Sequence, residues 1–331
     1  MSVTCATAGT VTAAASAVGR SGRSLPAVVA RAPGGTADVA YAGSLAYLNE
    51  KVVGPAFEAA TGDAYLGRAA GSVALSQEIA AGEITPNVFE SVGASPITAL
   101  EPRFTRWYVQ FAASPLVVAY DPSGRYGARL SAIAAGKKPL RDLFTLMATP
   151  GFALGRTDPN LDPQGAAFVE MVELAQRVLH LPPGSAHRIL GPGALGGSSS
   201  PEIFDETALE PRLQAGQLDA SSAFLSQAVQ LHLHYIALPA SIDLGDPADA
   251  ASYAKASVRL RGGTVVSGSP LVLDVTTIGS GDAAAADAFV AYVLSSKGLA
   301  RYEAGGYTLV RPRLFGARSS VPPSVLRELP S

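Results

Sequence analysis

Three short stretches of the chain combine a hydroxyl or a carboxylate with the expected start of a helix. Ser44 and Ser72 each follow a glycine, and Asp162 precedes a proline. Apolar residues at helical spacing come next, so all three are predicted N-caps. A helix start carries unpaired N–H groups and the positive end of the helix dipole. Taken singly, each residue is more often a structural cap, but three such starts in a weakly charged chain indicate an anion site.

Several blocks of the chain resemble the signature segments of one family, in the family's order. They are residues 41–45, 70–74, 107–112 with 116–120, 155–165 and 216–220. These blocks look like those of the molybdate/tungstate-binding extracellular solute-binding proteins of ABC transporters, in the type II periplasmic-binding-protein superfamily. The resemblance extends from about Val39 to about Phe315.

The resemblance implies a fold, a function and a set of ligand residues. The fold would be α/β and two-lobed, each lobe a mostly parallel sheet with flanking helices, joined by two crossover strands. The protein would be a monomeric, non-enzymatic receptor without a cofactor, which captures a small tetrahedral oxyanion and delivers it to a membrane ABC permease. The implied ligand residues are Ser44, Ser72, Asp162, Gln164, Gly165, Ser221 and Ser222.

The alternation of predicted strands and helices independently indicates an α/β protein with a parallel sheet. Two apolar segments open alike, with Ser-Pro at residues 114–115 and 269–270. They are the candidate strands that carry the chain to a second lobe and back. Lobe one would then hold residues 36–113 and 268–318, and lobe two residues 114–267. Residues 1–35 are expected to be a disordered tether and residues 319–331 a C-terminal tail, whereas one continuous doubly wound domain is the alternative.

The second lobe departs from the family pattern at two positions. Ala223 and Phe224 stand where the family typically has a glutamate and a tyrosine. A methyl group cannot coordinate a metal centre and a phenyl ring cannot donate a hydrogen bond; Ser226 and its neighbouring serines are possible substitutes. Asp162 is expected either to approach the metal centre or only to cap its helix. This leaves open another small oxyanion or an organic anion as the ligand.

Composition excludes several other classes of protein. Only 16% of residues are charged, the net charge is −2, and no Lys/Arg cluster occurs, which argues against a nucleic-acid partner. No Gly-x-Ser-x-Gly motif surrounds Ser44 or Ser72, so a serine hydrolase lacks support. His232 and His234 have the spacing of one strand face, but no third ligand for a metal lies nearby.

The single cysteine excludes an intramolecular disulfide bond. Cys5 precedes a stretch rich in Ala, Ser, Thr and Gly, so it is either a lipid attachment site of an extracytoplasmic protein or an incidental thiol. No stretch is long and apolar enough for a transmembrane helix. The Gly- and Ser-rich residues 191–200 lack the Lys-Ser/Thr ending of a phosphate loop and are interpreted as a mobile connection.

Overall fold

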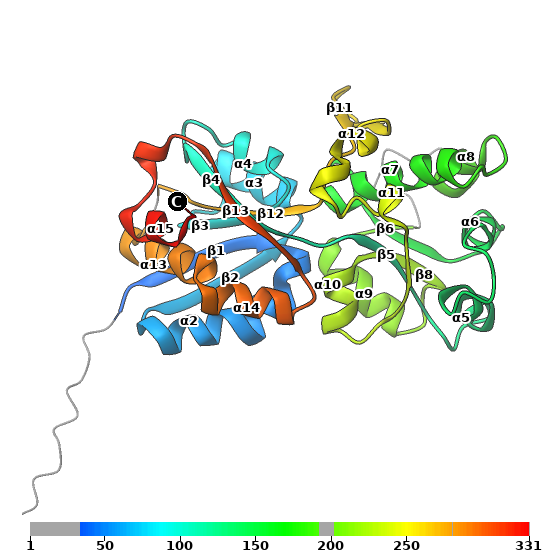
Figure 1. Ribbon diagram of the computed structural model, residues 1–331, viewed down its shortest axis with the longest axis horizontal. Coiled ribbons are helices and arrows are strands. Elements are labelled where there is room, and N and C mark those ends of the chain that lie inside the picture. The colour runs from blue at the N-terminus through cyan, green and yellow to red at the C-terminus, as the bar shows by residue number, and fades with distance from the viewer. Residues whose placement is uncertain (1–33, 192–201, 280, 331) are drawn as a thin grey trace, which may run out of the picture. The chain divides into compact units, whose positions relative to one another are not determined.

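The first sheet of the computed structural model has six strands within the described residues, in the order β13-β4-β12-β3-β1-β2 (Figure 1). The structure describes residues 34–191, 202–279 and 281–330. The strands are β1 (Thr36–Ala42), β2 (Ala64–Ala70), β3 (Val88–Val92), β4 (Trp107–Ala113), β12 (Val272–Thr277) and β13 (Thr308–Gly316). The tether expected at residues 1–35 and the connection expected at residues 191–200 lie almost entirely outside the described residues.

The second sheet has five strands in the order β7-β6-β8-β5-β9 among the residues that the structure describes. They are β5 (Leu116–Tyr120), β6 (Leu154–Thr157), β7 (Ile203–Phe204), β8 (Ala220–Phe224) and β9 (His234–Ala237). A separate antiparallel hairpin is formed by β10 (Ser257–Arg259) and β11 (Val265–Ser267).

Both sheets are mixed, which corrects the expectation of mostly parallel sheets. β1 runs parallel to β2 and β3, and β6 runs parallel to β7 and β8. β12 is antiparallel to β3 and β4, and β5 is antiparallel to β8 and β9. The parallel half of each sheet consists of strand–helix units. The antiparallel half contains the strands next to the passages between the sheets. The alternation of strands and helices does not specify the direction of these strands.

Helices cover both faces of the first sheet. Figure 1 shows α3 and α4 on one side and α2, α13 and α14 on the other. On the second side, the Phe57 and Phe289 rings pack edge to face with centroids 5.2 Å apart. The helical segments associated with this sheet are η1 (Gly43–Leu45), α1 (Ala46–Leu48), η2 (Asn49–Val53), α2 (Gly54–Thr61), α3 (Ser72–Ala81), α4 (Ser95–Thr98), α13 (Ala283–Leu294), α14 (Ser296–Ala304), η4 (Arg318–Ser320) and α15 (Pro323–Glu328).

The second sheet is also covered on two faces, since alternate residues of a strand point to opposite sides. Leu209 and Leu213 of α9 pack with Val117 of β5, whereas Phe168 of α7 joins the main core with Val118. The helical segments here are α5 (Gly127–Ala134), α6 (Arg141–Met147), α7 (Pro163–Val178), α8 (Ser185–Leu190), α9 (Glu206–Gln214), α10 (Leu225–Gln230), α11 (Ala240–Asp243), η3 (Pro247–Asp249) and α12 (Ala250–Tyr253).

The chain passes between the sheets at the two Ser-Pro segments singled out in the sequence. β4 of the first sheet ends at Ala113 and β5 of the second begins at Leu116; the chain re-enters the first sheet at β12. The two passages contact each other, because the Ser114 N–H donates to the Leu271 carbonyl at 3.1 Å. The chain thus changes from one sheet to the other where the lobe boundaries are expected. The boundaries themselves stay a prediction.

The expectation of a C-terminal tail at residues 319–331 is wrong for most of that range. Helix α15 packs against α13, and Val321 and Val325 are buried in the core. The amphipathic spacing of these two valines is the reason, because it gives a short segment one apolar face to bury.

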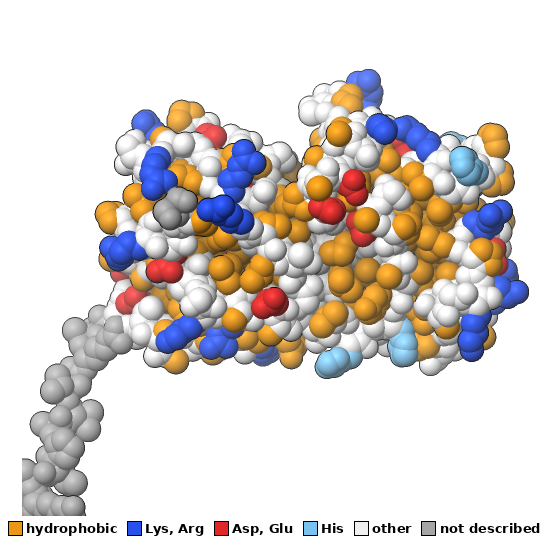
Figure 2. Space-filling model, viewed as in Figure 1, with side chains coloured by type: hydrophobic (Ala, Val, Ile, Leu, Met, Phe, Trp, Pro, Cys, Tyr) orange, Lys and Arg blue, Asp and Glu red, His pale blue; other side chains and the backbone are white. Residues whose placement is uncertain are grey.

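The surface agrees with the charge count. Figure 2 shows Lys and Arg side chains scattered over the visible face among apolar and neutral ones. Among the described residues, no helix is long and apolar enough to cross a bilayer.

Candidate functional site

The helical run from Gly43 to Thr61 begins directly after β1. Ala42 is its N-cap, with extended backbone dihedrals, and Ser44 lies inside the first turn. The prediction that Ser44 is the N-cap is therefore wrong, because the apolar strand continues straight into the turn. Ser44 is buried, and its Oγ has no hydrogen-bond partner within the part of the chain that the structure describes.

The first two N–H groups of this run bind a carboxylate from the far side of the sequence. Gly43 N–H donates to Glu206 Oε2 at 2.8 Å, and Ser44 N–H donates to Glu206 Oε1 at 2.9 Å. Glu206 is the first residue of α9 and is buried. Sequence reasoning missed Glu206, because an acidic residue in the first turn of a helix is ordinary and nothing local links it to Gly43.

The start of α3 is arranged differently. Gly71 is the N-cap and Ser72 the first helical residue, so the predicted cap is displaced by one position here and by two positions at Ser44. The Ser72 Oγ accepts a hydrogen bond from the Val92 N–H at 3.2 Å. The Ala74 N–H donates to the Leu161 carbonyl at 3.0 Å. The Ser72 hydroxyl and the Ala74 N–H at this second helix start are therefore already paired with backbone groups of the protein.

The start of α7 confirms the predicted cap. Asp162 is the N-cap, its Oδ1 accepts from the Gln164 N–H at 3.0 Å, and Pro163 is the first helical residue. The second carboxylate oxygen, Oδ2, is buried without a partner in the described ranges. Gly165 has a packing role, since a Cβ atom there would lie 2.4 Å from the Thr157 carbonyl oxygen.

The side chain of Gln164 ties α7 to β8 and α10. Its Oε1 accepts from the Ser222 hydroxyl at 3.1 Å, and its Nε2 donates to Gln227 Oε1 at 3.1 Å. Gln227 Oε1 also accepts from the Phe224 N–H at 2.9 Å. Gln227 was not predicted, although its position three residues after Phe224 fits the N3 position of a capping box.

Ser221 and Ser222 point to opposite faces of β8, as neighbouring strand residues do. Ser222 faces Gln164 of α7. Ser221 is buried and its Oγ lacks a partner among the described residues. The structure thus does not bring both serines to one face. Ala223 and Phe224, the positions that depart from the family pattern, are packed in the two hydrophobic clusters on either side of the strand.

Three buried carboxyl groups influence one another around the first helix start. Burial, together with the nearby Asp162 and Glu210, raises the pKa of Glu206 well above its ordinary value. Burial also raises the pKa of Asp162 to about 6 and that of Glu210 to about 7. The two backbone N–H groups lower the pKa of Glu206 but do not outweigh burial.

This arrangement can hold an anion through backbone dipoles. Two adjacent N–H groups at a helix start already bind both oxygens of one carboxylate. The buried Ser44 hydroxyl supplies a further donor beside them. The same geometry fits two oxygens of a tetrahedral oxyanion, which presents only acceptors.

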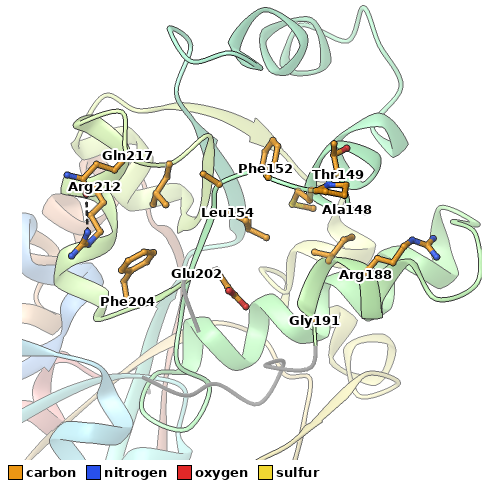
Figure 3. Close-up of a pocket in the computed structure, with 16 residues that line it drawn as sticks. Ala148, Thr149, Phe152, Leu154, Arg188, Gly191, Glu202, Phe204, Arg212 and Gln217 are labelled. Atoms are coloured by element: carbon orange, nitrogen blue, oxygen red, sulfur yellow. Dashed lines mark hydrogen bonds between the residues drawn. The ribbon is translucent and has the colours of Figure 1, made fainter. Parts of the chain in front are cut away.

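Other features of the described residues do not form a comparable site. No group of three or more His, Cys, Asp or Glu side chains suited to a metal ion occurs in ranges 34–191, 202–279 and 281–330. His234 begins β9, whereas His232 precedes the strand with a positive φ of 52°. A pocket of about 760 Å³ is lined by residues that include Leu154, Phe204 and Arg188 (Figure 3). It contains none of the seven predicted ligand residues.

Two mixed α/β sheets are joined by two crossing segments, and helix starts from both meet at buried polar side chains, which is the architecture expected of a two-lobed solute receptor. The chain belongs to the family of bacterial extracellular solute-binding proteins, whose model matches residues 37–308. This is a family of receptors that act outside the cell membrane and not of enzymes.

Relatives and solved structures agree with this assignment. The chain is 30% identical over 319 residues to a Haloferax volcanii protein named as a molybdenum-binding protein of an ABC transporter, covering 96% of this chain and 92% of the relative. It is 27% identical over 214 residues to the molybdate/tungstate-binding protein WtpA of Pyrococcus abyssi, covering 60% of each. The periplasmic molybdate-binding protein of Azotobacter vinelandii has a similar fold, with a TM-score of 0.53, 16% identity, and coverage of 82% of this chain and 98% of that one.

Proposed function

We propose that the protein captures a small tetrahedral oxyanion, with molybdate or tungstate favoured, and delivers it to an ABC importer. The observation that carries the proposal is the pair of N–H groups of Gly43 and Ser44, which bind both oxygens of a carboxylate beside an unpartnered hydroxyl. The names of the relatives from Haloferax volcanii and Pyrococcus abyssi support the choice of ligand.

In this proposal the ligand contacts come from both lobes, lobe one with residues 36–113 and 268–318 and lobe two with residues 114–267. Ser44 and the amides around it act from lobe one. Asp162 Oδ2 acts from lobe two, and Ser222 would do so only by exchanging its hydrogen bond to Gln164 Oε1 for one to the ligand. Ser72, Gln164 and Gly165 support these groups through the bonds and close packing described above, and Ser221 is a weaker candidate because it faces away from Ser222.

A thermal-shift screen of the whole protein tests the proposal. A ligand bound only by the native state stabilises it by mass action, by about 3 kcal/mol at a hundredfold excess over Kd. Molybdate and tungstate should raise the melting temperature, and sulfate should raise it less, because the smaller ion stretches the hydrogen bonds. The absence of any shift with molybdate, tungstate, sulfate and phosphate at millimolar concentration would contradict the proposal.

A receptor for an organic anion is the second candidate. The group bound at Gly43 and Ser44 is itself a carboxylate. A cavity of about 750 Å³ is lined by Val73 of α3, Pro163 and Ala166 of α7, and Gln110 of β4, among others; it includes the residues that follow Ser72 and Asp162 but none of the seven predicted ligand residues. That volume suits an organic solute. Stabilisation by small carboxylates but not by tetrahedral oxyanions would favour this candidate.

We further propose that the protein acts as a monomer with a membrane permease as its partner, and that Cys5 carries a lipid anchor. Residue 5 lies outside the described residues, and the proposal rests on the composition that follows it. Metabolic labelling with a fatty acid, with Cys5→Ser as the control, tests the anchor; equal labelling of both proteins would refute it.

A further inference from the structure

Glu206 lies where the proposed ligand would lie. Its two oxygens take one N–H each, at 2.8 and 2.9 Å, so the carboxylate satisfies the donor pair completely. The donors belong to the start of the helical run after β1, whereas the acceptor belongs to α9, which packs on the second sheet. An external anion cannot use these two amides while Glu206 holds them.

The surroundings are built to let a carboxylate approach this closely. A Cβ atom on Gly43 would lie 2.6 Å from Glu206 Oε2, so the absence of a side chain at residue 43 admits the carboxylate. Around it lie three buried polar atoms without a hydrogen-bond partner in the described ranges: Ser44 Oγ, Asp162 Oδ2 and Glu210 Oε1. Buried polar atoms are normally paired. Of these three, only the Ser44 hydroxyl is a donor, so it is the atom that indicates an anionic ligand.

We propose that Glu206 is an internal competitor, which a ligand must displace from the Gly43 and Ser44 amides and which thereby sets the affinity and selectivity of the receptor. The inference rests on the proposed function, because it concerns the same site. A monoanion that only reproduces the two bonds of Glu206 gains little. A tetrahedral oxyanion gains more, because its remaining oxygens can accept from the Ser44 hydroxyl.

The competitor makes binding depend on pH. The titratable groups that face Glu206 are Asp162 of α7, Glu210 of its own helix, and Tyr307, which follows α14. Asp162 and Glu210 repel both an ionised Glu206 and a bound anion. A protonated Glu206 holds the amides more weakly and can donate to an oxyanion. The affinity for the oxyanion should therefore fall as the pH rises.

Calorimetric titration with tungstate at about pH 6 and about pH 8 tests the proposal on the full chain. Glu206→Ala should bind tungstate at least about tenfold more tightly than the wild type at the higher pH, and its affinity should depend less on pH, with the part due to Asp162 and Glu210 remaining. Asp205→Ala is the matched control, because Asp205 lies one residue earlier, is exposed and makes no capping bond; it should behave as the wild type. Equal or weaker binding by Glu206→Ala, with the wild type binding, would overturn the proposal.

A second measurement separates this proposal from the proposed function. Removing the Glu206 side chain leaves room for a free carboxylate at the two amides, so propionate should raise the melting temperature of Glu206→Ala but not that of the wild type. Glu206→Gln, which keeps the shape of the side chain but offers one acceptor oxygen, serves if the alanine variant does not fold, and should likewise tighten tungstate binding. If propionate stabilises Glu206→Ala while no oxyanion binds any variant, the proposal that Glu206 is an internal competitor is supported and the proposed oxyanion function is contradicted. If propionate has no effect on the folded variant, the competitor is refuted.

Discussion

The chain contains two Gly-Ser helix starts that are nearly identical in sequence and opposite in structure. At Gly43-Ser44 the N–H groups hold a side-chain carboxylate and the serine hydroxyl has no partner among the described residues. At Gly71-Ser72 the hydroxyl accepts from a strand N–H and a carbonyl fills the first turn. The groups at the second start belong to the backbone and are fixed, whereas those at the first belong to a side chain that can move. In the proposed function, the same motif would therefore serve ligand exchange at one start and structure at the other.

Replacing each glycine by alanine tests this contrast with the largest expected effect. A Cβ atom at residue 71 would lie 2.5 Å from the Leu161 carbonyl oxygen, a backbone atom, and Gly71→Ala should cost about 3 kcal/mol of stability. At residue 43 the nearest atom belongs to the flexible Glu206 side chain, so Gly43→Ala should cost much less. Urea unfolding of both variants measures the difference in the free energy of unfolding. Equal losses of stability would contradict the contrast between the two helix starts.

The Glu206 carboxylate bound at Gly43-Ser44 should make stability depend on pH, whereas the backbone carbonyl bound at the start of α3 should not. The pKa values of Asp162, Glu206 and Glu210 are all raised, so the folded state binds more protons than the unfolded state above about pH 4. The stability of the ligand-free protein should therefore fall as the pH rises through about 6 to 7 and beyond, by several kcal/mol, since each unit of raised pKa is worth about 1.4 kcal/mol. Unfolding measured at about pH 5 and about pH 8 checks this. Glu210→Gln should flatten the dependence; a stability that rises with pH would show that these groups are not buried as described.

Replacing each serine by alanine separates stability from binding. Ser72→Ala leaves the buried Val92 N–H unpaired and should cost about 1–2 kcal/mol, with little change in affinity. Ser44→Ala removes a hydroxyl without a partner in the described residues; it should leave stability nearly unchanged and weaken tungstate binding by about tenfold. Calorimetric titration and thermal unfolding of both variants distinguish the two roles. The reverse pattern would place the ligand at α3.

The smallest effect on stability is expected from Asp162→Asn. Asparagine caps a helix about as well as aspartate, so at about pH 4, where Asp162 is protonated in the folded state, the change should stay within about 0.5 kcal/mol. At higher pH the variant should be more stable than the wild type, because it avoids a buried charge. If the unpartnered Oδ2 approaches the metal centre, the variant should lose any preference for tungstate over sulfate. If Asp162 only caps α7, affinity should hold or rise as repulsion is relieved. Competition titrations with the two anions decide between the roles.

Local signals in the sequence were sufficient for some of these features. The Asp-Pro pair at residues 162–163 defined the start of α7, since both side chains act within one turn. The Ser-Pro segments marked the passages between the sheets. The caps predicted at Ser44 and Ser72 were misplaced by two residues and one residue, because an apolar strand that runs directly into a helix leaves no polar boundary.

Other features depended on contacts between distant residues. Glu206 binds a backbone pair more than 160 positions away, and a backbone donor has no side-chain signature that could be paired with it. The two hydrogen bonds of the Gln164 side chain, to Ser222 and Gln227, also join residues about 60 positions apart. Strand direction was misjudged because the alternation of elements does not reveal how a chain returns from a second sheet.

The position of β12 has a consequence for how the chain acquires its structure. β12 lies between β4 and β3, so the first sheet stays divided until residues 272–277 are available. The strands of the second sheet are all complete by Ala237 and follow one another without interruption by the first sheet. The second sheet can therefore assemble while the first still lacks its central strand. Contacts of such long sequence separation slow folding, so closure of the first sheet by β12 should be the late step in maturation of the emerging polypeptide.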